Sequence, residues 1–144
     1  MISELANAGA MPSLELTLRF AAQRQRILAH NIANVNTPNF RPLDVSVTGF
    51  QRELREAIEQ RRARSGGEQG RLELRQTQEL RTDGGGLTLN PTTPADNILF
   101  HDRNNRDLER MMQDLAENAM AFRVASDLLK SRQELLRTAI SQRV

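Results

Sequence analysis

The segment NIANVNTPNF, residues 31–40, ends the first of two long runs of apolar positions spaced alternately three and four residues apart. The N-terminal stripe consists of Leu14, Leu18, Ala21, Gln25, Leu28, Ile32 and Val35. The C-terminal stripe consists of Leu108, Met112, Leu115, Ala119, Phe122, Ser126, Leu129, Gln133, Leu136 and Ile140. This spacing is that of the a and d positions of a coiled coil. Such positions form a narrow apolar stripe along one side of a helix, and a second helix has to pack against the stripe to bury it. The two ends of the chain are therefore predicted to pair with each other or with neighbouring molecules.

The first stripe predicts a helix over residues 13–34, with Ser13 as its N-cap. The helix has to end by residue 36, because Thr37 precedes a proline and is pushed out of the helical region. The next residues predict a tight turn with Pro38 second and Asn39 third, a place that favours positive φ. Asparagine is the best non-glycine residue for that backbone region.

The rest of the chain predicts a weaker middle and one more long helix. Residues 40–48 are predicted to be extended and to pack back onto the first helix, through Phe40, Leu43 and Phe50. Residues 49–63 predict a short second helix. Residues 64–106 hold six of the eight glycines and two of the five prolines, and predict a flexible segment with at most a hairpin of residues 72–74 and 87–89. A long helix follows over residues 107–141, opened by Asn104, Asn105 or Asp107.

The predicted fold is therefore all-α, with two long terminal helices forming a coiled-coil-like pair. One structural domain is formed by both termini: residues 1–63 carry the first helix, the turn and the short helix, residues 64–106 are flexible and partly extended, and residues 107–144 carry the last helix.

Composition argues against most chemical functions. Only 38% of the residues are hydrophobic, and there are five Phe but no Tyr or Trp, which disfavours enzymes, lectins and RNA binders. Twenty basic and 18 acidic residues are interleaved, which is typical of a solvated helix face. The absence of cysteine excludes disulfides and thiolate metal sites. The first residues lack the pattern of a cleavable signal peptide, and no stretch is apolar enough for a membrane span.

No catalytic, cofactor-binding or metal site is predicted. His30 and His101 lie in different elements without a third ligand, and Asp44 with Glu53 lacks a pocket that would shift a pKa. Two groups of polar residues have structural explanations. Asn31 and Asn34, on the last turn of the first helix, are predicted to bond loose carbonyls or the returning loop. Gln25, Ser126 and Gln133 interrupt the stripes, either as buried residues that fix the register or at an exposed edge.

Residues 24–41, RQRILAHNIANVNTPNFR, resemble the N-terminal signature of bacterial flagellar rod and hook proteins, N-I-A-N-x-N-T-P-G-[FY]. The matching positions are Asn31, Ile32, Ala33, Asn34, Asn36, Thr37, Pro38 and Phe40, and Asn39 replaces the usual glycine. Residues 104–140 resemble the C-terminal helix of the proximal rod proteins of this family, with NNRDLE, a following MQDLAENA and a closing LRTAI.

The resemblance implies a structural subunit that is exported through the flagellar type III apparatus and built into the periplasmic rod of the basal body. Its implied partners are other copies of itself, other rod proteins, the rod-base adaptor and the MS ring, with no nucleic acid or small-molecule substrate. The predicted assembly contacts are Leu14, Leu18, Leu28, Ile32, Val35, Leu108, Met112, Leu115, Phe122, Leu129, Leu136 and Ile140. The alternative is a basic helical adaptor that binds nucleic acid or an anionic membrane surface.

Overall fold

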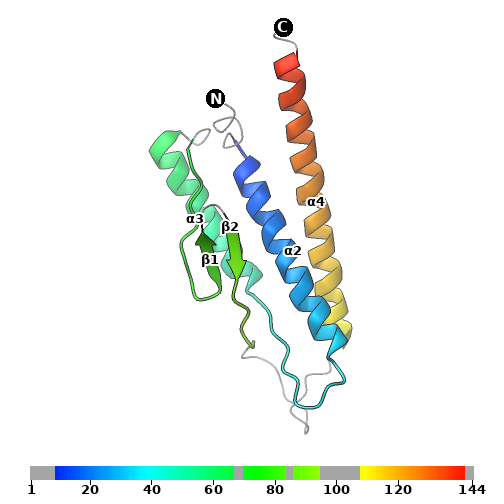
Figure 1. Cartoon of the computed structure of the whole chain (residues 1–144). Helices are drawn as coiled ribbons and strands as arrows, with labels where there is room; N and C mark the ends of the chain where they lie inside the picture. The colour runs from blue at the N-terminus through cyan, green and yellow to red at the C-terminus, as the bar shows by residue number, and fades with distance from the viewer. Residues whose placement is uncertain (1–8, 67–69, 84–85, 95–107, 142–144) are drawn as a thin grey trace.

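Two long helices, one from each end of the chain, lie side by side and antiparallel in the computed structural model (Figure 1). The structure describes residues 9–66, 70–83, 86–94 and 108–141. Helix α2 spans Met11–Ala33 and helix α4 spans Leu108–Ser141. The predicted cap residues of α4 at 104, 105 and 107 lie outside the described residues, and α4 is helical as far as residue 141, the last described residue.

The start of α2 differs from the prediction. The helix begins at Met11, and Ser13 is not its N-cap; the Ser13 hydroxyl instead donates to the carbonyl of Ala10 at 2.8 Å. Pro12 lies in the first turn, where a proline removes no hydrogen bond because the first N–H groups of a helix have no partner inside it. The helix therefore begins two residues before the predicted residue 13.

Helix α3 spans Val47–Ser65 and is two residues longer at each end than predicted. At its start the Ser46 hydroxyl accepts a hydrogen bond from the N–H of Gly49 at 2.9 Å, which satisfies one of the unpaired donors. At its end Gly66 takes a left-handed conformation with φ 70°, which costs glycine little.

The middle of the chain forms an antiparallel hairpin that contains only one of the two predicted pieces. Strand β1 is Leu80–Asp83 and strand β2 is Gly86–Leu89, with Leu80 opposite Leu89 and Asp83 opposite Gly86. The predicted piece 87–89 lies in β2, whereas the predicted piece 72–74 belongs to neither strand. The register leaves two residues between the strands, the connection length that favours hairpins, and the run of glycines at 84–86 was the signal for it.

The hydrophobic core lies between α2, α3 and the hairpin. Its buried residues are Leu16, Phe20, Val45, Phe50, Ala57, Leu74, Leu80, Leu87 and Leu89. Phe20 and Phe50 stack with ring centroids 4.1 Å apart, as the prediction that Phe50 packs back onto the first helix requires. The side chain of Gln23 fixes the edge of β2 to α2, since its amide donates to the carbonyl of Leu87 and accepts from the N–H of Leu89 at 3.1 Å.

The predicted fold class is confirmed: the described chain is mostly helical, with long terminal helices and an irregular middle that carries one small hairpin. The four core leucines of residues 74–89 were not anticipated as core residues. Within the described ranges, no helix has an apolar stretch long enough to span a bilayer.

Candidate assembly surface

The turn after α2 has the geometry that its sequence predicted. The N–H of Phe40 donates to the carbonyl of Thr37 at 3.2 Å, so these residues bound a β-turn with Pro38 second and Asn39 third. Asn39 has φ 59°, and no other non-glycine residue of the described part of the chain has positive φ. The predicted positive φ at Asn39 is therefore confirmed.

Two asparagines of the motif hold the turn against the helix. Nδ2 of Asn34, the C-cap residue, donates to the carbonyl of His30 at 2.9 Å. Asn31 is 2% exposed, and its amide donates to the carbonyl of Leu43 at 2.6 Å and accepts from the N–H of Leu43 at 3.1 Å. Asn31 thus binds the returning loop as predicted, whereas Asn34 binds a carbonyl of the last helical turn that also accepts the backbone N–H of Asn34 at 3.2 Å.

An ion pair between buried Arg24 and half-buried Asp44, which the sequence analysis missed, fixes the same loop. Nε and Nη2 of Arg24 donate to the two carboxylate oxygens of Asp44 at 2.9 and 2.7 Å. Burial lowers the pKa of Arg24, but the hydrogen bond and charge of Asp44, with the charges of Asp114 and Glu117, outweigh it and raise the pKa. The guanidinium is therefore a permanent positive charge between α2, the loop and α4.

Asp114 on α4 also has a raised pKa, which for a carboxyl group disfavours the charged form. Its pKa is raised, first by burial and then by the negative charges of Asp44 and Glu117, while Arg24 and Arg110 act in the other direction. The contact between α2 and α4 thus contains a carboxylate whose charged form is disfavoured.

A second buried polar contact joins α2 to α4 directly. Nδ2 of Asn118 donates to the carbonyl of Ala21 at 2.9 Å and to Oε1 of Gln25 at 2.6 Å, and Asn118 is 4% exposed. Gln25 is thus a partner in a buried polar layer, the arrangement that fixes register in coiled coils. Ser126 is half-buried and Gln133 is exposed.

The face that α4 turns toward α2 is offset from the predicted stripe. The buried residues of α4 are Met111, Asn118 and Ala125, each one position before the stripe residues Met112, Ala119 and Ser126. Spacing alone allows both choices, because each set combines with Leu115, Phe122 and Leu129 into a three-four pattern. The sequence signal that favours the observed face is its polar residue Asn118, which can bond the polar Gln25 in the stripe of α2.

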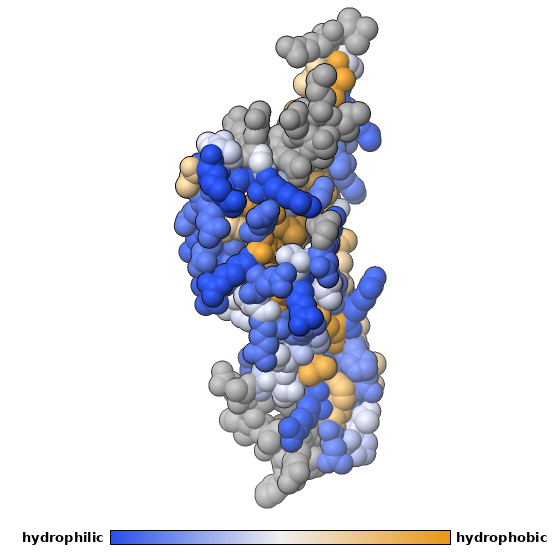
Figure 2. Space-filling view, turned by 60° about the vertical axis from the view of Figure 1, so that its left-hand side comes forward, coloured by the Kyte–Doolittle hydropathy of each residue, from blue (hydrophilic) through white to orange (hydrophobic). Residues whose placement is uncertain are grey.

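The predicted contact residues differ in burial accordingly. On α2, Leu28 is buried, and Leu14, Leu18, Ile32 and Val35 are half-buried. On α4, Leu115, Leu129 and Leu136 are half-buried, and four are exposed: Leu108 at 41%, Met112 at 55%, Phe122 at 40% and Ile140 at 57%. Hydrophobic surface remains visible along the molecule and near the C-terminal end of α4 (Figure 2).

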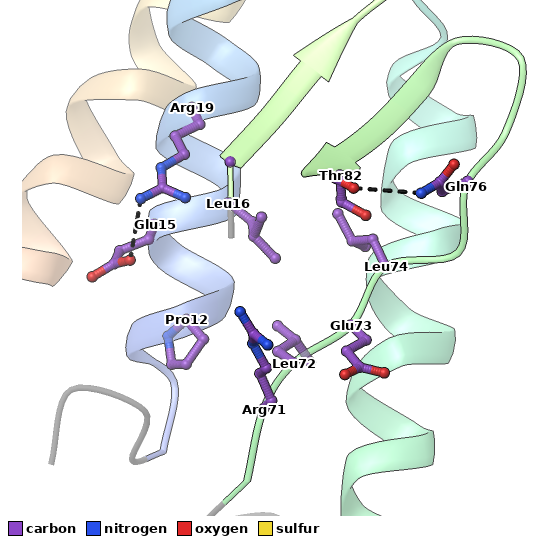
Figure 3. A pocket seen from close by; sticks show the side chains of 11 residues that line it. Pro12, Glu15, Leu16, Arg19, Arg71, Leu72, Glu73, Leu74, Gln76 and Thr82 are labelled. Carbon is purple, nitrogen blue, oxygen red and sulfur yellow. Dashed lines mark hydrogen bonds and ion pairs between the residues drawn. The ribbon is translucent and has the colours of Figure 1, made fainter. Parts of the chain in front are cut away.

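A hollow lies between α2 and residues 71–76 (Figure 3). Glu15 pairs with Arg19 at 3.8 Å, and Glu73 and Arg71 add one charge of each sign, so the lining has no net charge. Asp44 and Glu53, the two carboxylates considered as an acid–base pair, have different partners: Asp44 pairs with Arg24 at 2.7 Å, and Glu53 lies 3.6 Å from Arg52.

Neither histidine supplies a metal site in the part of the chain that is described. His30 packs edge-on against Phe40 with ring centroids 5.7 Å apart, and His101 lies outside the described residues. Among the described residues, no three or more His, Asp or Glu side chains form a group that could hold a metal ion.

Comparison with known proteins assigns the chain to a family. The family model described as "Flagella basal body rod protein" matches residues 17–41, which cover most of α2 and the turn. The chain is 33% identical over 111 residues to "Flagellar basal body rod protein FlgB" of Borrelia hermsii, covering 73% of this chain and 76% of that protein. The chain belongs to the FlgB family of flagellar basal body rod proteins.

Other FlgB relatives extend the likeness over most of the chain. The FlgB of Bacillus subtilis (strain 168) is 26% identical over 136 residues, 93% of this chain and 95% of that protein. The FlgB of Yersinia enterocolitica is 30% identical over 122 residues, 79% of this chain and 80% of that protein. The exposed apolar residues of α4 therefore belong to a flagellar basal body rod protein.

Proposed function

We propose that this chain is a structural subunit of the proximal rod, which assembles through its terminal helices into the tubular drive shaft that transmits torque and conducts exported subunits. One observation carries the proposal. All eight large hydrophobic residues that are exposed in the described chain lie on α4: Leu108, Met112, Met120, Phe122, Val124, Leu128, Leu135 and Ile140.

The length of α4 explains part of this exposure. With 34 residues against 23 in α2, it is about 51 Å long against about 35 Å. Its C-terminal end extends past the start of α2 (Figure 1). Leu135 and Ile140 on that end are 60% and 57% exposed. Burying such side chains is worth about 1.5–3 kcal/mol each, so covering them with neighbouring subunits supplies a strong drive for assembly.

The proposed partners follow from membership in the family. They are other copies of this chain, other rod proteins, and the rod-base adaptor and MS ring. The proposed route to the rod is the flagellar type III export apparatus, and the proposed place is the periplasmic part of the basal body. No catalytic role is proposed.

Leu135→Asp tests the proposal with little effect on the fold of the subunit, because the side chain is 60% exposed. We expect a variant that is made and exported but missing from purified basal bodies, with loss of motility, because a buried unpaired carboxylate is costly. Leu135→Met is the matched control and keeps an apolar side chain of similar volume, so it should be incorporated normally. Normal amounts of the Asp variant in basal bodies would contradict the proposed assembly.

A further inference from the structure

Helix α4 carries an exposed apolar ridge on the flank that faces away from the groove between α2 and α4. The ridge consists of Ala121, Val124, Leu128 and Leu135, spaced three, four and seven residues apart, all exposed. This spacing places them on one face of the helix. None is among the residues that α4 buries against α2, so the ridge is a second apolar face.

The groove lies on the other flank of α4. It has a volume of about 720 Å³, and its apolar floor is formed by Ala22, Ala29, Ala119 and Phe122. Ala119 and Ala121 are two residues apart, which is about 200° around a helix, so groove and ridge lie on opposite sides of α4. Helix α4 thus offers a hollow on one side and a ridge on the other.

Ridge and groove also lie at the same level along the helix. The groove uses α4 residues from Ala119 to Lys130, and the central ridge residues run from Ala121 to Leu128. A second copy rotated about an axis parallel to α4 therefore brings its ridge to the groove without sliding along the axis. Such a head-to-tail contact uses two different surfaces and continues into a ring or a helical array.

One pair of opposite charges can meet across the two surfaces. Arg26, Arg123 and Lys130 line the groove against one acidic residue, Asp127. Glu117 lies four residues before Ala121 on the ridge side, and its exposed carboxylate accepts one hydrogen bond, from Nε2 of Gln113 at 2.9 Å. Gln25 contacts Asn118, so Arg26 lies close to the level of Glu117 on α4. The Glu117 of a rotated neighbour would therefore face Arg26.

From these observations we infer that the α4 ridge of one copy docks into the α2–α4 groove of the next copy, with Glu117 paired to Arg26 across the contact. The inference rests on the proposed function and names the surfaces that join copies of this chain.

Disulfide trapping tests the geometry, because the native chain has no cysteine. Ala22→Cys places a thiol in the groove and Ala121→Cys places one on the ridge. Oxidation of basal bodies that contain the double variant should give a ladder of covalent dimers, trimers and larger species. Each single variant should stay monomeric, as should Ala22→Cys combined with Gln51→Cys on the exposed face of α3.

Charge reversal tests the pairing. Arg26→Glu and Glu117→Arg should each lower the amount of chain per basal body by about tenfold, and the double variant should restore it. Dimers from Ala121→Cys alone would show a symmetric contact and overturn the inference, and so would cross-links to a different rod protein. Chain present in basal bodies without cross-links would overturn the inference and leave the proposed function standing. Absence of the native chain from basal bodies would overturn both.

Discussion

Helix α2 has a neighbour on each side, and the two contacts are built in different ways. Toward α3 and the hairpin it contributes Leu16 and Phe20 to a closed apolar core. Toward α4 the contact centres on a polar layer at Asn118, and α4 buries only three residues. The difference is one of closure: the first contact encloses its apolar side chains, whereas the second leaves apolar side chains of α4 exposed.

The largest expected effect is on the closed core. Phe20→Ala removes the ring that stacks on Phe50 and leaves a cavity, which should lower the free energy of unfolding by about 3–5 kcal/mol. Phe122→Ala, at a side chain that is 40% exposed on α4, should cost about 1 kcal/mol or less. Urea unfolding of both variants measures the difference. If both variants lost the same free energy of unfolding, the two contacts of α2 would not differ in the way described.

The second effect is on the docking of α4. Asn118→Ala leaves the Gln25 amide and the Ala21 carbonyl without this partner, at a cost of about 1–2 kcal/mol. Hydrogen exchange of α4 amides should become about 5–30 times faster, with little change at Phe20. Gln133→Ala, at an exposed position of α4, is the control and should change neither. Equal acceleration in α4 and at Phe20 would mean that the two contacts open together.

The smallest effect is a pH dependence of the same contact. The pKa of Asp114 is raised above its ordinary value of 3.8 by burial and by neighbouring carboxylates. The docked state therefore takes up this proton more readily, so docking strengthens as pH falls through the raised pKa and levels off below the ordinary value. Asp114→Asn should remove this part of the pH dependence of α4 hydrogen exchange. The same pH dependence in native and Asn chains would refute the role of Asp114.

Several features of the chain were readable in its sequence because they depend on neighbouring residues. The turn at residues 37–40 follows from the backbone limits of Pro38 and the tolerance of Asn39 for positive φ, and both act locally. The two long helices follow from uninterrupted periodicity. The motif asparagines were correctly interpreted as hydrogen-bonding groups, because both lie where the helix ends and the chain turns back along it.

Other features depend on residues far apart in the chain, and only the tertiary structure decided them. Asn118 and Gln25 are 93 positions apart, and their pairing selects one of two faces that spacing alone allows for α4. Arg24 and Asp44 are joined only when the turn brings the returning loop back along α2. Local sequence therefore determined where the helices and the turn form, whereas long-range contacts between buried polar groups determined which face of α4 is covered and which remains open.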